Sequence, residues 1–294
     1  MSNPTYVLGS SPRELSRLSL QAQLIRPITE RLLRQLGIKE GLRVLDLGCG
    51  AGDVSMLAAE MVGPLGSVVG IDQSAAAIAK AEARVRDSGY PQISFCVSSV
   101  EEFCSAEKFD VVIGRYVLIH QPSPSDFLRA ARRHVRPGGV IAFHEVCCHH
   151  ELRSLPKAPL FERMAKLLKI GASAFPSYDA AGRLLEHFRM ADLPHPELFA
   201  EMLMGGGMDS PLYAWMAETI GSLTPLLVKQ GVTSEEEISI DTLEERLRSQ
   251  VVKMKSQLVG HPQVCAWVRL DGSGERGSEE RERSGIMQSD LAYA

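Results

Sequence analysis

The sequence lacks a long apolar run, an excess of positive charge and the features of a secretion signal. No stretch approaches the roughly 18 consecutive apolar residues that a membrane-spanning helix needs. The formal net charge is −4, which favours neither nucleic acid nor an anionic membrane as a partner. The first residues have neither a basic start nor an apolar core. We therefore expect a cytoplasmic protein with reduced thiols that binds neither nucleic acid nor membrane.

The six cysteines also lack any C-x-x-C pair. Only Cys147 and Cys148 are neighbours, within HEVCCHHE at 144–151. Adjacent side chains on a strand point to opposite faces, and known zinc ligands are separated by at least two residues. We therefore expect no metal site and interpret this segment as the end of a strand running into a loop.

The most informative segment that is present is RVLDLGCGAG, at 43–52. An apolar run with one acid ends in three alternating glycines, and DVSMLAAEMV follows with helical spacing of its apolar residues. This pattern predicts a strand, a glycine turn and a helix. The glycines permit positive φ and a close approach of the backbone to a ligand, and the helix start offers unpaired N–H groups.

Three details of this turn distinguish it from a dinucleotide site. It reads G-x-G-x-G rather than G-x-G-x-x-G, Asp46 lies inside the preceding strand, and no phosphate-binding Lys-Ser or Lys-Thr follows. The turn resembles motif I of the class I S-adenosylmethionine (SAM)-dependent methyltransferases. FDVVIGRYVLIHQPSP (109–124) and RPGGVIAFHEV (136–146) resemble the fourth and fifth strands of that family with their loops. YVLGSSPRELSRL (6–18) resembles the lead-in of its small-molecule, ubiquinone/menaquinone-type branch.

Alternating strand and helix patterns predict an α/β fold with a parallel sheet between helices. The expected strands are 43–47, 67–72, 92–97, 109–114 and 139–146, and the expected helices are 53–62, 75–88 and 124–135. The resemblance implies a Rossmann-like, doubly wound, seven-stranded sheet with helical cap insertions. In that fold a strand near 197–204 and an antiparallel strand at 264–270 complete the sheet.

The chain divides into four expected parts. Residues 1–40 form N-terminal helices that cover the site, with Pro27 separating two of them. Residues 41–150 form the SAM-binding core, and 151–270 the rest of the sheet with cap insertions at about 151–175 and 205–260. Residues 271–294 form a disordered tail. The insertions are interpreted as a lid whose hinge is Gly205-Gly206-Gly207, or alternatively as a structural appendage that includes a dimer surface.

The resemblance implies where SAM is held. The loop Gly48-Cys49-Gly50 is expected to surround the amino-acid end and the ribose. Asp46 is expected to orient that loop or to approach the SAM ammonium group through water. Asp72 ends the second strand, where an acid accepts both ribose hydroxyls.

Further SAM contacts are expected from other loops. Gln73 lies beside the adenine, and Ser99 takes the place of the acid that the family often has there, with Val100 flanking the ring. Arg115 follows the fourth strand, where the family contacts SAM through the backbone. Tyr6 is expected to close over SAM.

SAM is already reactive, so alignment of the nucleophile, methyl group and sulfur is the main requirement. Where the acceptor must lose a proton, His120 and Glu145 are the candidate catalytic residues, with His144 nearby. Loop-fixing or structural hydrogen bonds are the alternatives for His120 and Glu145. The expected reaction is methyl transfer to oxygen, carbon or nitrogen of a mid-sized hydrophobic small molecule, as in secondary metabolism. The alternatives are cyclisation or rearrangement with SAM bound, or SAM binding without catalysis, and a homodimer remains open.

Overall fold

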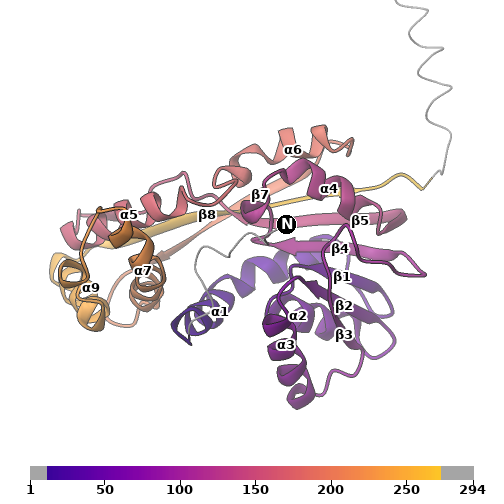
Figure 1. Ribbon diagram of the computed structural model, residues 1–294, viewed down its shortest axis with the longest axis horizontal. Helices are drawn as coiled ribbons and strands as arrows, with labels where there is room; N and C mark the ends of the chain where they lie inside the picture. Colours follow the sequence, from indigo (N-terminus) through magenta and orange to yellow (C-terminus); the bar gives the residue numbers. More distant parts are fainter. Residues whose placement is uncertain (1–11, 273–294) are drawn as a thin grey trace, which may run out of the picture.

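The computed structural model describes residues 12–272. Tyr6 and all but the first two residues of the tail expected over 271–294 lie outside this range. The described chain runs from a long N-terminal helix through an alternating α/β core into a helical region and back (Figure 1). The helices are α1 (Pro12–Gln35), α2 (Asp53–Val62), α3 (Ala75–Ser88), α4 (Pro124–Arg132), α5 (Pro159–Ala172), α6 (Leu184–Met190), α7 (Leu212–Lys229), α8 (Glu235–Ile238) and α9 (Ile240–Met254), with short 3-10 helices η1 (Leu118–His120) and η2 (Ala180–Arg183). The strands are β1 (Arg43–Leu47), β2 (Ser67–Asp72), β3 (Ile93–Val97), β4 (Phe109–Arg115), β5 (Val135–Val146), β6 (Arg153–Leu155), β7 (Glu197–Gly205) and β8 (Gln257–Arg269).

The strands form one mixed sheet of eight strands. The order β3-β2-β1-β4-β5 is parallel, and β8 pairs antiparallel with β5. The chain order therefore reverses beside β1, where open α/β sheets bind ligands beyond the carboxyl ends of their strands. β7 pairs antiparallel with the other side of β8. The α/β class, the parallel core and the antiparallel last strand are confirmed, and the short strand β6 is an addition that the sequence did not predict.

Helices cover both faces of the core sheet (Figure 1). On one face, Leu32 of α1 and Leu57 of α2 pack with Val44 and Val111 of the strands. On the other face, α4 and α6 bury a separate cluster that includes Phe143 and Phe188. The strands are buried from both sides, which explains why their sequences are continuous apolar runs.

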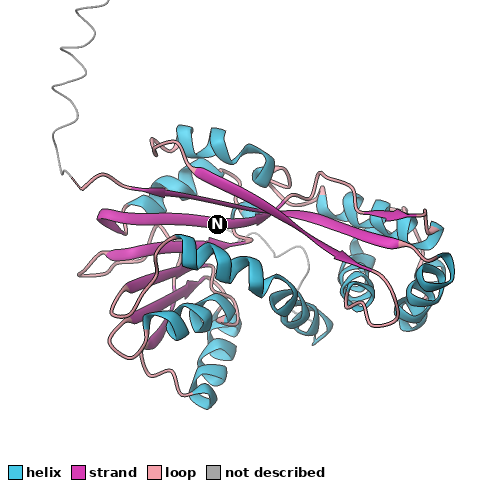
Figure 2. Ribbon diagram, turned by 180° about the vertical axis from the view of Figure 1, so that it is seen from behind, coloured by secondary structure: helices cyan, strands magenta, loops and turns pink. Residues whose placement is uncertain are grey.

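A second hydrophobic core lies in the cap, which comprises α5 and residues 206–256. Its buried residues include Phe161 of α5, Tyr213 and Met216 of α7, and Leu247 of α9. The long β7–β8 hairpin extends from the core sheet to these helices, as seen from behind in Figure 2. Helix α1 packs against α7 of the cap and against α2 of the α/β core.

Two sequence expectations about these elements are wrong. Pro27 does not divide the N-terminal segment, since α1 continues through it as one helix. Packing on both sides of Pro27 explains this, with Leu24 against the cap and Ile28 against the sheet. In addition, β8 begins at Gln257 rather than near residue 264, so the inserted helices end earlier than expected. None of the helices between residues 12 and 272 has the length and apolar character that spanning a bilayer requires.

Candidate functional site

The loop between β1 and α2 bends through three glycines in the left-handed backbone region. The φ angles are +63° at Gly48, +54° at Gly50 and +83° at Gly52. Residues with a Cβ atom adopt this region only at a cost. A Cβ atom on Gly48 would also lie 2.5 Å from Cγ1 of Val117. This glycine loop, residues 48–52, therefore brings bare backbone to the end of β1 and leads directly into the N-terminus of α2.

Asp72 ends β2 and connects the glycine loop to the next turn. One of its carboxylate oxygens accepts the N–H of Gly50 at 3.0 Å, and the other accepts the N–H of Ser74 at 2.8 Å. A carboxylate has about four acceptor positions, so both oxygens can still receive a hydroxyl donor. Asp72 is partly exposed, and Gln73 beside it is exposed. Asp72 thus holds two loops together and remains available to a diol.

Asp46 is buried inside β1. Its carboxylate accepts a hydrogen bond from the Ser55 hydroxyl at 2.6 Å, which joins the strand to the first turns of α2. Burial raises the pKa of Asp46 to about 7, against the opposing effects of the Ser55 hydrogen bond and the Arg115 charge. These contacts fit the loop-orienting role expected of Asp46, and its approach to the SAM ammonium group stays a prediction.

Two more contacts fix the glycine loop from its sides. The N–H of Cys49 donates to the Ile71 carbonyl of β2 at 2.9 Å, and burial raises the pKa of the Cys49 thiol. From α3, Arg84 donates to the Ala51 carbonyl at 2.6 Å and to the Asp53 carboxylate at 2.9 Å. The sequence did not indicate Arg84, because it is one of several charged residues on an ordinary amphipathic helix.

The turn after β3 uses Ser99 as a cap. Its hydroxyl accepts the N–H of Glu102 at 3.2 Å and donates to the Glu102 carboxylate at 3.3 Å. Val100 is buried in the core beside Ile71, and its carbonyl lies 2.9 Å from Nε2 of His134. Both residues therefore shape the loop, and their contacts with adenine stay predictions.

A buried polar network connects α1, β4, β5 and β8. The Arg115 guanidinium donates to the Thr29 hydroxyl at 3.3 Å, and that hydroxyl lies 3.0 Å from Nδ1 of His144. Nε2 of His144 lies 3.2 Å from Oε1 of Gln263, which also accepts the Tyr116 hydroxyl. Burial and the Arg115 charge lower the pKa of His144 to about 3, so the imidazole is neutral and can accept at Nδ1 while donating from Nε2. The network, residues 29, 115, 116, 144 and 263, fixes α1 onto the sheet.

A small cavity adjoins this network where α1, the cap and β8 meet. It is lined on its polar side by Tyr116, Gln263 and His261, and on its apolar side by residues that include Leu24 and Trp215. Tyr116 has φ of +57°, a strained conformation for a residue of this size. Such strain is typical of residues that surrounding structure holds in place for a function.

Glu145 holds the turn that carries His120. It is fully buried, and its Oε1 accepts the N–H groups of Val117 and Leu118, each at 2.9 Å. Burial raises the pKa of Glu145 to about 8, against these backbone hydrogen bonds. His120 ends η1 and contacts the edge of Phe175 with ring centres 5.1 Å apart. The geometry gives Glu145 the structural hydrogen bonds that were one of its two expected roles.

Comparisons with known proteins now identify the family. A family model described as a methyltransferase domain matches residues 38–186, just over half of the chain. The chain belongs to the class I SAM-dependent methyltransferases. SAM is therefore its cofactor, and the glycine loop, Asp72 and the turn after β3 lie at the strand ends where this fold binds ligands.

The methyltransferase is also similar to named relatives. It is 33% identical to the ubiquinone biosynthesis O-methyltransferase of Aromatoleum aromaticum over 54% of this chain and 66% of that protein. It is 34% identical to an arsenite methyltransferase of Aquipseudomonas alcaligenes over 38% of this chain and 35% of that protein. The matches thus span only part of these relatives. The solved YcgJ protein from Bacillus subtilis superposes with a TM-score of 0.55 at 14% identity, covering 83% of this chain and 98% of that chain, which shows the shared fold.

Hydrogen bonds connect the glycine loop of the methyltransferase with the end of β2, where several of the expected cofactor residues lie. The N–H of Gly50 donates to the Asp72 carboxylate, and the N–H of Cys49 donates to the Ile71 carbonyl next to Asp72. The expected catalytic residues belong to a different turn, which follows β4. His120 ends η1 in this turn, and Glu145 accepts the N–H of Val117 just before η1. Tyr116 and Gln263 were missed, because only the folded chain brings residues that far apart in sequence together.

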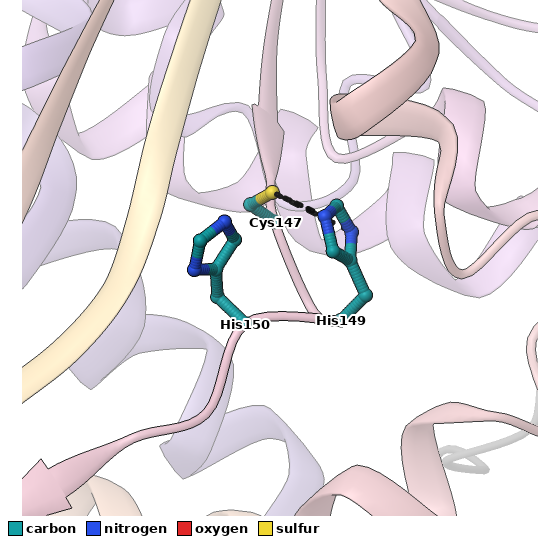
Figure 3. A group of neighbouring side chains, drawn as sticks. All are labelled: Cys147, His149 and His150. Carbon is teal, nitrogen blue, oxygen red and sulfur yellow. Dashed lines mark hydrogen bonds between the residues drawn. The ribbon is translucent and has the colours of Figure 1, made fainter.

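The methyltransferase also differs from expectation at the segment HEVCCHHE. The segment runs from the end of β5 at Val146 into a turn, as expected. Its ligand-type side chains were expected to diverge, but the turn brings them together. Atoms of Cys147, His149 and His150 that can bind a metal consequently lie within 4.8 Å of one another (Figure 3). The geometric argument against a metal site is therefore wrong.

Proposed function

We propose that the methyltransferase transfers the methyl group of SAM to an oxygen, carbon or nitrogen atom of a mid-sized, largely apolar small molecule. The observation that carries the proposal is the Asp72 carboxylate, which spans Gly50 and Ser74 beside the three left-handed glycines. This arrangement combines diol acceptors with exposed backbone, as the ribose and amino-acid end of SAM require. The proposal includes the cytoplasmic location and the role in secondary metabolism that composition and resemblance favour.

The SAM contacts follow from this placement. Asp72 accepts the ribose hydroxyls, and the glycine loop surrounds the amino-acid end. Gln73 and Ser99 lie on the adenine side, because they follow β2 and β3. Asp46 acts through Ser55 and α2 rather than by direct contact, since its carboxylate is buried. Arg115 is anchored to Thr29 and contacts SAM through its backbone in this proposal.

We place the acceptor at the cavity lined by Tyr116, Gln263 and Trp215. Its walls combine an aromatic and aliphatic surface with a few polar groups. The cavity encloses only about 20 Å³, which is room for a single water molecule. Binding of an acceptor in this proposal therefore requires α1 and the cap to move apart. One relative's name refers to ubiquinone biosynthesis and another's to arsenite, which are chemically very different. The acceptor class is therefore argued from the cavity, and the aliphatic and aromatic lining favours an organic molecule over an inorganic ion.

The chemistry requires alignment more than activation. Transfer breaks the bond between sulfur and the methyl carbon of SAM as the acceptor's lone pair forms the new bond, leaving S-adenosylhomocysteine. A bound near-attack geometry supplies most of the acceleration such a reaction needs. For acceptors that must lose a proton, His120 is the proposed base, and Glu145 is a positioning residue that fixes the turn before it.

The test is acceptor screening with SAM carrying a deuterated methyl group. Purified full-length protein is incubated with pools of phenols, catechols, carboxylic acids and amines, and mass spectrometry records labelled products and S-adenosylhomocysteine. We expect a labelled product from a compound with an apolar body, and none from the Asp72→Ala variant. Tight SAM binding with conversion of an acceptor that gains no label would instead support cyclisation or rearrangement. SAM binding without any turnover would contradict the proposed transfer.

A further inference from the structure

The turn after β5 gathers three metal-binding side chains outside the cofactor site. Cys147 is buried, His149 is partly exposed and His150 is exposed. Figure 3 shows the imidazoles of His149 and His150 on either side of the Cys147 sulfur. His149 is held in place by close packing, because a Cβ atom on Gly182 would lie 2.4 Å from its Cε1. The ring is thus fixed next to the thiol by the fold.

The spacing fits a tetrahedral ion. The Cys147 sulfur lies 3.6 Å from each ring nitrogen of His149. A zinc ion with bonds of about 2.3 Å to sulfur and about 2.0 Å to nitrogen places two such ligand atoms roughly 3.5 Å apart at the tetrahedral angle. The two side chains already have this separation. The remaining pairs of ligand atoms, all within 4.8 Å, require only small rotations.

A fourth candidate ligand comes from β8. The antiparallel register pairs Val146 with Gln263, and the N–H of Cys147 donates to the Pro262 carbonyl at 2.9 Å. His261 precedes Pro262 in β8. Burial lowers its pKa, and His149 and His150 lie close enough for their charges to lower it further. Its ring nitrogens are not among the atoms within 4.8 Å of one another, so binding requires its side chain to rotate toward the cluster. His261 is 4% exposed, and neither of its ring nitrogens has a hydrogen-bond partner. Buried polar groups without partners are uncommon, and a metal bond would satisfy one of these nitrogens.

We propose that Cys147, His149, His150 and His261 bind one zinc ion. Thiolate and imidazole ligands suit zinc rather than calcium or magnesium, which prefer oxygen. On binding, the Cys147 thiol releases its proton to solvent as the sulfur–zinc bond forms. Four protein ligands close the site, so the ion is structural. It connects the turn that leads from the core sheet into the cap with the strand β8, which both regions share.

The test is a zinc titration of metal-free, full-length protein by isothermal calorimetry. We expect one equivalent of Zn²⁺ to bind and to raise the melting temperature. The variants Cys147→Ser and His150→Asn should bind Zn²⁺ at least tenfold more weakly, and His261→Gln should also bind more weakly. Because His150 is exposed, its replacement should leave the metal-free fold unchanged in circular dichroism. Cobalt titration adds a direct signature, since a thiolate-to-Co²⁺ absorption band should appear in the wild type and not in Cys147→Ser.

Cys96→Ser and His195→Asn are the matched controls, because both residues are exposed and lie outside the cluster. Both should retain wild-type zinc affinity. Equal affinity of the wild type, Cys147→Ser and His150→Asn would overturn the site. Unchanged affinity in His261→Gln would overturn the closed, four-ligand form of the proposal.

Discussion

The cofactor side and the acceptor side of the methyltransferase are built in different ways. On the cofactor side, Gly48, Gly50 and Asp72 come from two adjacent strands and act through backbone groups and one carboxylate. On the side proposed for the acceptor, Tyr116, Gln263 and Trp215 come from the turn after β4, from β8 and from α7, and present their side chains to the cavity. The first depends on loop conformation, which few residues can supply. The second depends on packing between distant segments, which many sequences can supply, and such a surface can change its acceptor while SAM binding persists.

The largest expected effect is on the glycine loop. Gly48→Ala adds left-handed strain of roughly 1–2 kcal/mol and a contact with Val117 that costs about 1–3 kcal/mol. We expect SAM affinity to fall at least a hundredfold in calorimetry, with a lower melting temperature. Gly50→Ala is the matched control, because φ is also positive there but no atom lies within 4 Å of the added Cβ. If the melting temperature falls by the same amount in both variants, the contact with Val117 does not contribute to the effect of Gly48→Ala.

The next largest effect is expected at Asp72, and it should concern SAM binding. Asp72→Asn weakens hydrogen bonds to a charged group worth roughly 1.5–3 kcal/mol. SAM affinity should therefore decrease about tenfold or more, as measured by calorimetry. Gln73→Ala, its exposed neighbour, should change the affinity much less. An unchanged affinity in Asp72→Asn would remove the ribose assignment.

A smaller effect is expected at Tyr116, where a substitution should affect use of the acceptor but not the affinity for SAM. Tyr116→Phe removes the hydroxyl that donates to Gln263, a contribution of about 0.5–1.5 kcal/mol. With an acceptor from the screen, kcat/KM should decrease about three- to tenfold while SAM affinity stays the same. The control is Tyr213→Phe, whose hydroxyl donates to the Gly207 carbonyl within the cap. An equal decrease in kcat/KM in both variants would indicate that Tyr116 contributes to stability and not to acceptor binding.

The smallest effect on ligand binding is expected at Glu145. Its pKa is raised from 4.5 to about 8, so the native state retains a proton that the unfolded chain releases. Stability from this group is fully present below pH 4.5 and is lost as the pH rises toward 8. Glu145→Gln should remove this decline, which is on the order of 1.4 kcal/mol per pH unit within the window.

Urea unfolding of both proteins at pH 5 and pH 8 measures this difference, and SAM affinity at neutral pH should match the wild type. Asp46 also has a raised pKa and contributes equally to both curves, so the comparison isolates Glu145. If the free energy of unfolding changes by the same amount between pH 5 and pH 8 in both proteins, the ionisation of Glu145 is not coupled to folding.

Sequence patterns predicted the cofactor half closely. β1, β2, α2 and α3 have the expected bounds, because buried runs, glycine turns and the Ser74 cap determine them locally. The position of Asp72 at the end of β2 could be predicted for the same reason, and its role with the ribose stays a prediction.

The cap and the metal-type cluster were less predictable, because they depend on contacts between distant segments. Residues 257–263 contain Gly260 and Pro262 and do not resemble a strand, but pairing with β6 and β7 extends β8 through them. Two of the three glycines expected to form a hinge are closely packed, since an added Cβ atom would lie 2.4 Å from the Ser210 hydroxyl at Gly205 and 2.8 Å from the Ser256 carbonyl at Gly206. At Gly207 no atom lies within 4 Å of an added Cβ atom. In this region, Met204 and Met208 are exposed, whereas Trp215 lines the cavity.

The β7–β8 hairpin has a consequence for how such proteins diversify. Gly205 pairs with Leu258, so the two ends of the inserted segment 206–256 are neighbours in the ladder. A turn of a few residues is enough to join strands at that distance. The segment is therefore a cassette that recombination can exchange as one uninterrupted stretch of gene, leaving the methyl-donor half of the protein untouched.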